Sequence, residues 1–466
     1  MQSDDGSKGA KRVMMLETPI SRLIPQMAAP TIIALLINSI YSMADTYFVS
    51  SLGTSATAAV GVNMSIDLTI MMAGSFLAIG ANSYISRLLG AKQNHMASKT
   101  LSTAFFSAMI LGSLVMIPGL MFTGPLVQFL GATEDSMGYA VEYANYILLV
   151  APFMASSFVL NHCLRSEGSP VYSMIGMVSG AVLNIILDPI FIFNLGLGVK
   201  GAAIATAISK IVSFCILIFP YAAQKSVLKI SLKYISYSKD IIREITLMGL
   251  PSFLRMGLGV VSNILINKIA GSYSDSALAA ISVVTRIMTF PTSAMLGFGQ
   301  GFMPVAGYNW GARSYDRVKS SYRFSSIAGV LFIAAGCALI AVFSEQIILL
   351  FTEADESLVE IGRLCLISQC IAMPLNAWVI VVNMLYSALG KPVGAIILGT
   401  TRQGFCLIPV LFILPSLFGI DGLSVSQAVA DGFSFLITIP FAIFISKSIA
   451  TAQKNELKLP RDKQLN

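Results

Sequence analysis

The sequence predicts an all-α polytopic membrane protein with twelve transmembrane helices, arranged as two six-helix lobes. The first observation is composition: of 466 residues, 55% are hydrophobic and 11% are charged, and the mean hydropathy is +0.78, which excludes an ordinary soluble protein. The second is that the apolar runs are long and lack the alternation typical of a membrane β-barrel. The third is an internal repeat that divides the chain into two similar halves.

Charged residues and Gly- or Pro-rich breaks divide the sequence into twelve candidate spans. Each is longer than the roughly 20 residues that an α-helix needs to cross a bilayer. The run that starts at residue 20 is too long for the apolar core of a cleaved signal peptide, so we interpret it as a retained first helix. The spans cover about residues 20–50, 54–86, 96–122, 136–164, 169–194, 198–222, 240–269, 276–309, 318–343, 357–386, 392–416 and 421–447.

Basic residues collect in alternate connections between these spans. Lys and Arg number 30 against 23 Asp and Glu, a formal charge of +7, yet one side of the predicted topology has only Lys200 among acids such as Glu134 and Asp135. Because cytoplasmic loops carry the excess of Lys and Arg, we expect a plasma-membrane protein with both termini cytoplasmic, and no nucleic-acid partner. The cytoplasmic segments are the tails 1–19 and 449–466 and the inter-lobe linker 223–239.

The two halves of the chain align at a constant shift of 221 residues. The shift pairs Pro30 with Pro251, Gly80 with Gly301 and Gly198 with Gly419. It defines an N-lobe over 20–222 and a C-lobe over 240–448. Because six spans are an even number, both copies enter the membrane in the same direction, so their pseudo-twofold axis should run along the membrane normal, as in transporters built from parallel repeats.

Four polar residues of the first lobe are expected at similar depth. Asp45, Asp188 and Thr206 each lie about 10 Å below the outer end of their spans, and Asn184 lies one helical turn from Asp188 on the same face. Intramembrane carboxylates are costly and are usually functional, so these oxygens are a candidate site for H⁺ or Na⁺. Pro189 weakens the helix beside Asp188. For Thr206 alone, a hydrogen bond between helices is the simpler interpretation.

Two further charged pairs are expected within the membrane. Asp67 and Lys210 lie deeper than the four polar residues, and Lys210 either pairs permanently with an acid or is displaced when the coupling ion arrives. Arg402 and Asp431 of the second lobe both lie near the midplane, where we predict a structural ion pair that joins the last two helices.

No residue pattern indicates an enzyme, a metal centre or a nucleotide site. The six cysteines include no CxxC pair, and we predict free thiols. The two histidines form no HExxH motif. Gly297, Gly299 and Gly301 superficially look like a phosphate loop, but they lie in an apolar span with no following Lys-Ser, so we predict close helix packing there. No cofactor is expected besides the coupling ion.

Several segments resemble the multidrug and toxic compound extrusion (MATE) family across residues 20–448. They are YSMADTYFV at 41–49, RSEGSPVYSM at 165–174, NIILDPIFIF at 184–193, GVKGAAIATAIS at 198–209 and RQGFCLIP at 402–409. The resemblance to the prokaryotic branch implies a cation site at Asp45, Asn184, Asp188 and Thr206, and a bend of the first helix at Pro30. The branch with acids on helices 7 and 10 is not matched.

The resemblance implies a secondary antiporter that exports amphipathic, cationic organic compounds in exchange for H⁺ or Na⁺. We expect a monomer in the lipid bilayer, whose partners are small-molecule drugs and whose lobes provide alternating access. The alternative is a flippase for lipid-linked saccharides of the same architectural superfamily, although such a protein would need a more basic cavity than the acidic site predicted here.

Overall fold

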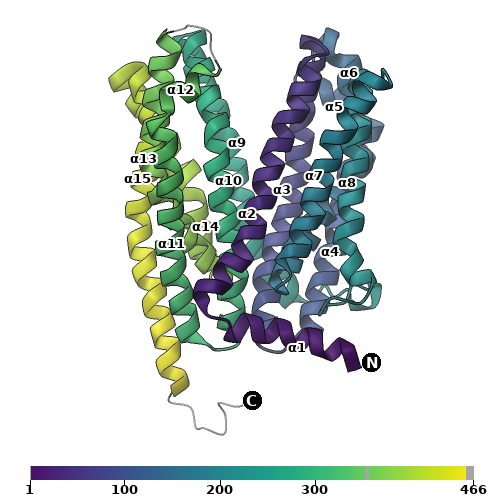
Figure 1. The fold of residues 1–466 in the computed structure, drawn as a ribbon, viewed down its shortest axis with the longest axis vertical. Helices are drawn as coiled ribbons and strands as arrows, with labels where there is room; N and C mark the ends of the chain where they lie inside the picture. Colours follow the sequence, from purple (N-terminus) through teal and green to yellow (C-terminus); the bar gives the residue numbers. More distant parts are fainter. Residues whose placement is uncertain (1, 352–355, 458–466) are drawn as a thin grey trace. The chain divides into compact units, whose positions relative to one another are not determined.

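The chain is helical through nearly all of the residues that the structure describes, 2–351 and 356–457, in a computed structural model (Figure 1). Residues 352–355 and most of the predicted C-terminal tail 449–466, from residue 458 on, lie outside the described residues. The α-helices are α1 (Gln2–Glu17), α2 (Ile20–Ser50), α3 (Thr54–Gly90), α4 (Asn94–Met121), α5 (Thr123–Phe129), α6 (Glu134–Ser166), α7 (Pro170–Pro189), α8 (Gly198–Ala222), α9 (Lys239–Tyr273), α10 (Asp275–Gly311), α11 (Tyr315–Val342), α12 (Ser344–Leu349), α13 (Glu356–Ala388), α14 (Pro392–Thr400) and α15 (Leu407–Leu457).

Three short elements interrupt this pattern. Two are π-helices, η1 (Ile190–Asn194) and η3 (Thr401–Cys406), and the third is the 3₁₀ turn η2 (Leu232–Tyr234). η1 follows Asp188 and Pro189 at the end of α7, and η3 contains Arg402. The wider turn of a π-helix reorients the side chains that follow it, and such insertions are frequent at functional sites.

The described helices include eleven that are long and apolar enough to cross a membrane. The last of these is a continuous stretch of 65 residues, Pro392–Glu456, which is broken by a non-helical backbone at Gly419 (φ 61°, ψ −137°). Only glycine adopts this conformation readily. The stretch therefore contains two spans joined at Gly419, and the predicted all-α fold with twelve spans is confirmed.

The chain forms two compact units, and their composition does not follow chain order. The first contains Met1–Met14 and Ile33–Gly249, and the second contains Met15–Ile32 and Leu250–Asn466. The first half of α2 thus belongs to the second unit, and the start of α9 belongs to the first. Within the second unit, Ala28 of α2 contacts Gly301 of α10, where an added Cβ would lie 2.4 Å from the Ala28 Cα.

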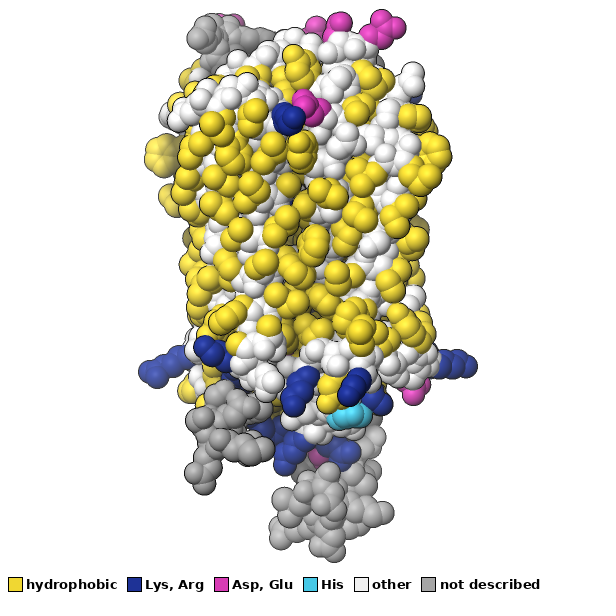
Figure 2. Space-filling model, turned by 90° about the vertical axis from the view of Figure 1, so that its right-hand side faces the viewer, with side chains coloured by type: hydrophobic (Ala, Val, Ile, Leu, Met, Phe, Trp, Pro, Cys, Tyr) yellow, Lys and Arg dark blue, Asp and Glu magenta, His cyan; other side chains and the backbone are white. Residues whose placement is uncertain are grey.

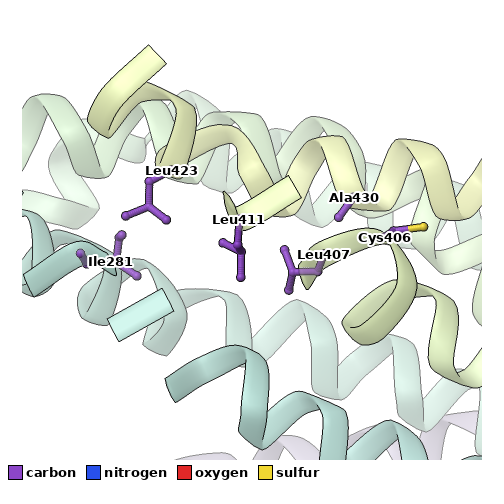
Figure 3. Close-up of a cluster of buried hydrophobic side chains, with 7 residues drawn as sticks. Ile281, Cys406, Leu407, Leu411, Leu423 and Ala430 are labelled. Atoms are coloured by element: carbon purple, nitrogen blue, oxygen red, sulfur yellow. The ribbon is translucent and has the colours of Figure 1, made fainter. Parts of the chain in front are cut away.

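A central helix organises each unit. In the first, α6 packs against α3, α4 and α8, and 78% of its most apolar window is buried. In the second, α13 packs against α10, α11 and α15. A cluster of buried apolar side chains, shown in Figure 3, connects α9, α10, η3 and α15, and includes Ile281, Leu407, Leu411 and Leu423. The predicted close packing at Gly297 and Gly301 is present, because both glycines contact α2.

Segments outside the spans pack on the first unit. The N-terminal segment that we expected to be a polar tail forms α1, which lies across the end of α3, where Arg12 donates to the carbonyls of Leu89 and Gly90 (Figure 1). The linker between α8 and α9 is bound to α4, because Ser102 accepts from Ser231 N and donates to Lys229 O. The linker and α1 up to Met14 are therefore folded parts of the first unit, whereas the last turn of α1, from Met15, belongs to the second.

Surface charge is divided between the two ends of the helices. Figure 2 shows one face, on which apolar side chains form a broad band, with Lys and Arg gathered mainly at one end and Asp and Glu mainly at the other. An apolar band of this kind suits contact with lipid. The different charge at its two ends agrees with the sequence, in which Lys and Arg collect in every second connection between the spans.

Candidate functional site

The candidate site of the first unit begins at the end of α7. Asn184 and Asp188 are one turn apart on α7 and both are buried, with exposed fractions of 1% and 0%. Pro189 ends the α-helix directly after Asp188, and the chain continues as the π-helix η1. Because proline cannot donate to the helix ladder, this change of helix type falls where the sequence is least able to continue an α-helix.

Asp45 of α2 meets Asp188 of α7 within the first unit. Their carboxyl groups lie close enough for the two charges to act on each other, and both side chains are buried. Oδ1 of Asp45 has no hydrogen-bond partner among the described residues. Two buried carboxylates that lie close together repel each other when both are ionised, so this arrangement is suited to holding a cation.

Asn184 connects this carboxyl pair to Thr206 of α8. In the amide orientation that satisfies both neighbours, Asn184 donates to Asp188 Oδ2 at 2.9 Å and accepts from Thr206 Oγ1 at 3.1 Å. All four residues that the sequence nominated, Asp45, Asn184, Asp188 and Thr206, are thereby brought into one buried network. The network draws on three helices that are distant in the sequence.

Two tyrosines belong to the same network and were missed by the sequence reasoning. The phenols of Tyr41 and Tyr143 both lie beside Thr206. Tyr41 lies one turn before Asp45 on α2, so helical spacing could have placed it on the same face as the acid. Tyr143 comes from α6, and no spacing within the sequence connects it to the other residues.

Asp67 and Lys210 lie beside this network. The ammonium of Lys210 is 5.3 Å from the centre of the Tyr41 ring, and its charge acts on both Asp45 and Asp67. Oδ1 of Asp67 has no hydrogen-bond partner among the described residues. Lys210 therefore packs against an aromatic ring near the acids. The sequence left open whether Lys210 pairs permanently with an acid or is displaced by the coupling ion, and this position is intermediate between the two.

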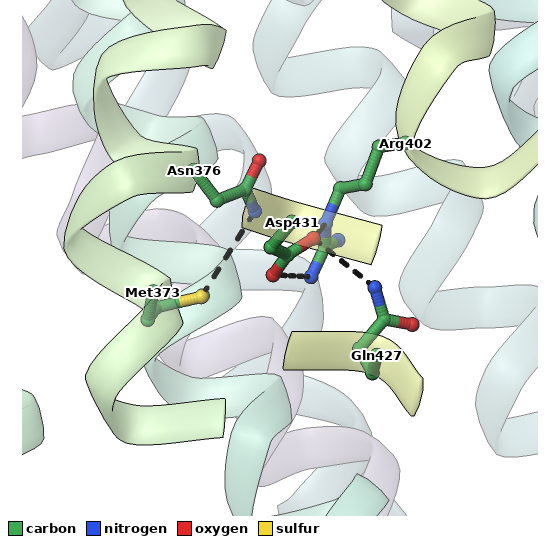
Figure 4. Close-up of polar contacts among 5 residues, drawn as sticks. All are labelled: Met373, Asn376, Arg402, Gln427 and Asp431. Carbon is green, nitrogen blue, oxygen red and sulfur yellow. Dashed lines mark hydrogen bonds and ion pairs between the residues drawn. The ribbon is translucent and has the colours of Figure 1, made fainter. Parts of the chain in front are cut away.

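The second unit contains the ion pair between Arg402 and Asp431, drawn in Figure 4. Arg402 Nε lies 2.7 Å from Asp431 Oδ1 and Nη2 lies 3.3 Å from Oδ2, so the pair is bidentate. Gln427 adds a hydrogen bond to Oδ1 at 3.1 Å. Arg402 stands in the π-helix η3 and Asp431 in α15, so the pair joins the two spans on either side of Gly419.

The remaining predicted residues are more simply placed. Pro30 lies inside α2, which continues from Ile20 to Ser50. It stands two residues before Ile32, after which the chain enters the first compact unit. The six cysteines are free thiols. No group of three metal-ligating side chains occurs among the residues that the structure describes.

Long apolar helices in two repeated sets, with buried acids and bases along the spans, define a membrane transporter. The sequence profile of the MatE family matches residues 30–190 and 251–413. A curated relative, the multidrug export protein MepA of Staphylococcus saprophyticus subsp. saprophyticus, is 31% identical over 431 residues, 92% of this chain and 95% of the relative. The MepA of Staphylococcus haemolyticus is 29% identical, with 95% and 97% covered.

Solved structures give the same result. The outward-facing conformation of a multidrug resistance MATE family transporter of the MOP superfamily superposes with a TM-score of 0.88 at 25% identity, covering 95% of this chain and 98% of that one. The chain belongs to the MatE family. It is accordingly a transporter and not an enzyme.

Proposed function

We propose that this protein is a multidrug efflux antiporter of the plasma membrane, which exports amphipathic, cationic organic compounds in exchange for H⁺ or Na⁺. The proposal is supported by the MepA relatives, which are named as multidrug export proteins and match along nearly their whole length. It is also supported by the acidic network of the first unit, which attracts cations. Both termini are proposed to be cytoplasmic, on the charge pattern of the connections.

The observation that carries the coupling proposal is the contact between the carboxyl groups of Asp45 and Asp188. In one state of the transporter the pair holds a cation, and in the other it is exposed to substrate or to solvent. Because two neighbouring carboxylates repel each other when both are ionised, a bound H⁺ or Na⁺ would stabilise the pair. Asn184 and Thr206 orient Asp188 in both cases.

The membrane potential supplies enough energy for this exchange. One elementary charge that crosses 100 mV releases about 2.3 kcal/mol, equivalent to roughly a fifty-fold concentration gradient. The occupied and empty states of the first-unit site would then favour opposite orientations of the lobes, so that the inward movement of the ion is coupled to the outward movement of the drug.

The test is export of a fluorescent organic cation, ethidium, from proteoliposomes under separately imposed pH and sodium gradients. We expect Asp45→Asn and Asp188→Asn each to slow gradient-driven export at least about tenfold, since each removes an ionisable group of the coupling site. Asp240→Asn, at an exposed position on α9, is the matched control and should export normally. Wild-type rates in both acid variants would show that the coupling site lies elsewhere.

A further inference from the structure

We propose that the second unit contains a binding site for small amphiphilic carboxylates, in a cavity beside the ion pair of Arg402 and Asp431. The site is separate from the cation network, because its residues come from α9, α10, α13, η3 and α15. The inference also stands independently of cation coupling, since it concerns an anionic ligand and is tested without a gradient.

The cavity is large enough for an aromatic acid. Its volume is about 260 Å³, whereas a cavity of about 150 Å³ in another protein already accepts benzene. It is open on one side, where Thr285 and Thr289 of α10 are exposed along its wall. A ligand can therefore enter without unfolding of the unit.

Arg402 provides the group that would recognise a carboxylate. Its guanidinium binds Asp431 through Nε and Nη2, which leaves Nη1 for another partner in the cavity. The carboxamides of Gln369 and Gln427 lie on the same lining, and beside the bonds that they donate to Cys365 Sγ and Asp431 Oδ1 each nitrogen carries a second N–H. A planar guanidinium with several N–H groups matches the geometry of a carboxylate better than any other side chain does.

The local charge balance favours an anion. Arg255 of α9 lies close enough to Arg402 for the two charges to repel each other. No salt bridge joins Arg255 to an acid among the described residues. Arg255 thus adds a second positive charge near Arg402, whose own charge is paired with Asp431. Because a charge without a partner inside the membrane is costly, a carboxylate bound near these two arginines would be stabilised.

Part of the cavity lining is apolar. Ile281, Leu411 and Leu423 line the cavity and also belong to the buried cluster of Figure 3. A ligand with a carboxylate at one end and an apolar body at the other can therefore bind Arg402 and cover these side chains together. A free inorganic anion would use only the polar wall.

The test is equilibrium binding of radiolabelled benzoate to the full-length protein in nanodiscs of neutral phosphatidylcholine. We expect saturable binding that unlabelled benzoate displaces, and that benzyl alcohol and benzylamine, of similar size but without the negative charge, do not. Displacement by benzyl alcohol as strong as that by benzoate would overturn the proposal, as would the absence of saturable binding.

Charge substitutions locate the site. Thr289→Glu places a carboxylate on the exposed cavity wall and should weaken benzoate binding at least about tenfold, whereas Thr289→Gln, matched in size but neutral, should bind more tightly than the Glu variant. Ser282→Glu adds the same charge to an exposed position of α10 outside the cavity and should leave binding unchanged.

A second variant removes the recognising pair itself. Arg402→Gln with Asp431→Asn deletes both charges without leaving a buried carboxylate unpaired, and it should also lose binding. Each variant is first required to show a single melting transition. If Thr289→Glu fails to fold, Thr285→Glu, one turn earlier on the same helix, replaces it. Equal binding by the folded Glu and Gln variants would place benzoate elsewhere and refute the assignment.

Discussion

Lys210 places a tethered ammonium beside the proposed coupling site. It lies over the Tyr41 ring and its charge acts on Asp45 and Asp67. A fixed positive charge competes with an arriving cation for the same carboxylates. Lys210 should therefore set how much external cation is needed to saturate the site.

We expect Lys210→Gln to lower the cation concentration that gives half-maximal export by about tenfold. This is the effect of removing ~1.4 kcal/mol of repulsion between Lys210 and the arriving cation. The measurement is the dependence of proteoliposome export on the imposed ion concentration. Lys233→Gln, at an exposed position in the linker, is the matched control. An unchanged half-maximal concentration in Lys210→Gln would mean that Lys210 has only a packing role.

Protonation of Glu167 should make the stability of the first unit depend on pH. It lies between α6 and α7, where it accepts hydrogen bonds from Ser226 and Val227 N of the linker. Burial raises the pKa of Glu167 above its ordinary value of 4.5. The folded state therefore holds the proton more tightly than the unfolded chain, so this contribution to stability is complete below pH 4.5 and is lost as the pH rises through the raised pKa.

We expect Glu167→Gln, which keeps an acceptor for both donors, to melt at a higher temperature than the wild type at pH 7 and above, with the difference shrinking toward pH 4.5. Thermal unfolding in detergent at a series of pH values measures it. Glu142→Gln on the surface of α6 is the control. A difference between wild type and Glu167→Gln that does not depend on pH would contradict the burial argument.

Residue types revealed the acids of the site but not all of their partners. Asp45 and Asp188 could be predicted because charge inside an apolar span is rare and depth can be counted from the span ends. Tyr143 could not, because tyrosine is common in spans and its contact with Thr206 depends on how α6 packs against α8. That Arg255 lies near Arg402 and has no acidic partner could not be predicted either, because the sequence does not give the distance between these two residues.

At the scale of elements, glycines decide how closely helices approach. A Cβ at Gly80 of α3 would lie 2.1 Å from the carbonyl oxygen of Ile245 in α9, whereas a Cβ at Gly61 of the same helix meets nothing within 4 Å. Contact with a backbone atom cannot be relieved by a change of rotamer, so the two helices would have to separate.

Gly80→Ala should therefore reduce the free energy of unfolding by about 1–3 kcal/mol, as overpacking of tight cores does. Gly61→Ala should be neutral or slightly stabilising, because alanine favours the helix. Thermal unfolding of the two variants side by side gives the comparison. Equal melting temperatures would show that α3 and α9 are not in close contact in solution.

The spans themselves followed from hydropathy because a bilayer allows few alternatives to an apolar helix. The elements that differ from the prediction are those about which hydropathy gives no information. α1 was expected to be a polar tail, yet it is helical and donates to the end of α3 through Arg12. The π-helices η1 and η3 differ from α-helices by a single hydrogen-bond step, and only Pro189 gave a sign of the first.

At the scale of the whole molecule, the two units carry polar sites of opposite charge. The first gathers three carboxyl groups, those of Asp45, Asp67 and Asp188, around the single ammonium of Lys210. The second sets Arg255 and Arg402 against Asp431. The two proposed sites therefore call for ligands of opposite charge, a cation in the first unit and a carboxylate in the second.

The chain passes from one compact unit to the other at three points, between Met14 and Met15 in α1, between Ile32 and Ile33 in α2, and between Gly249 and Leu250 in α9. The crossings in α2 and α9 each lie within one turn of a proline, Pro30 or Pro251, which cannot donate a helical hydrogen bond. These two helices therefore each have a joint at the boundary of a unit. Bending there breaks no further helical hydrogen bond, so the stiffness of both helices depends on two pyrrolidine rings in equivalent positions of the repeat.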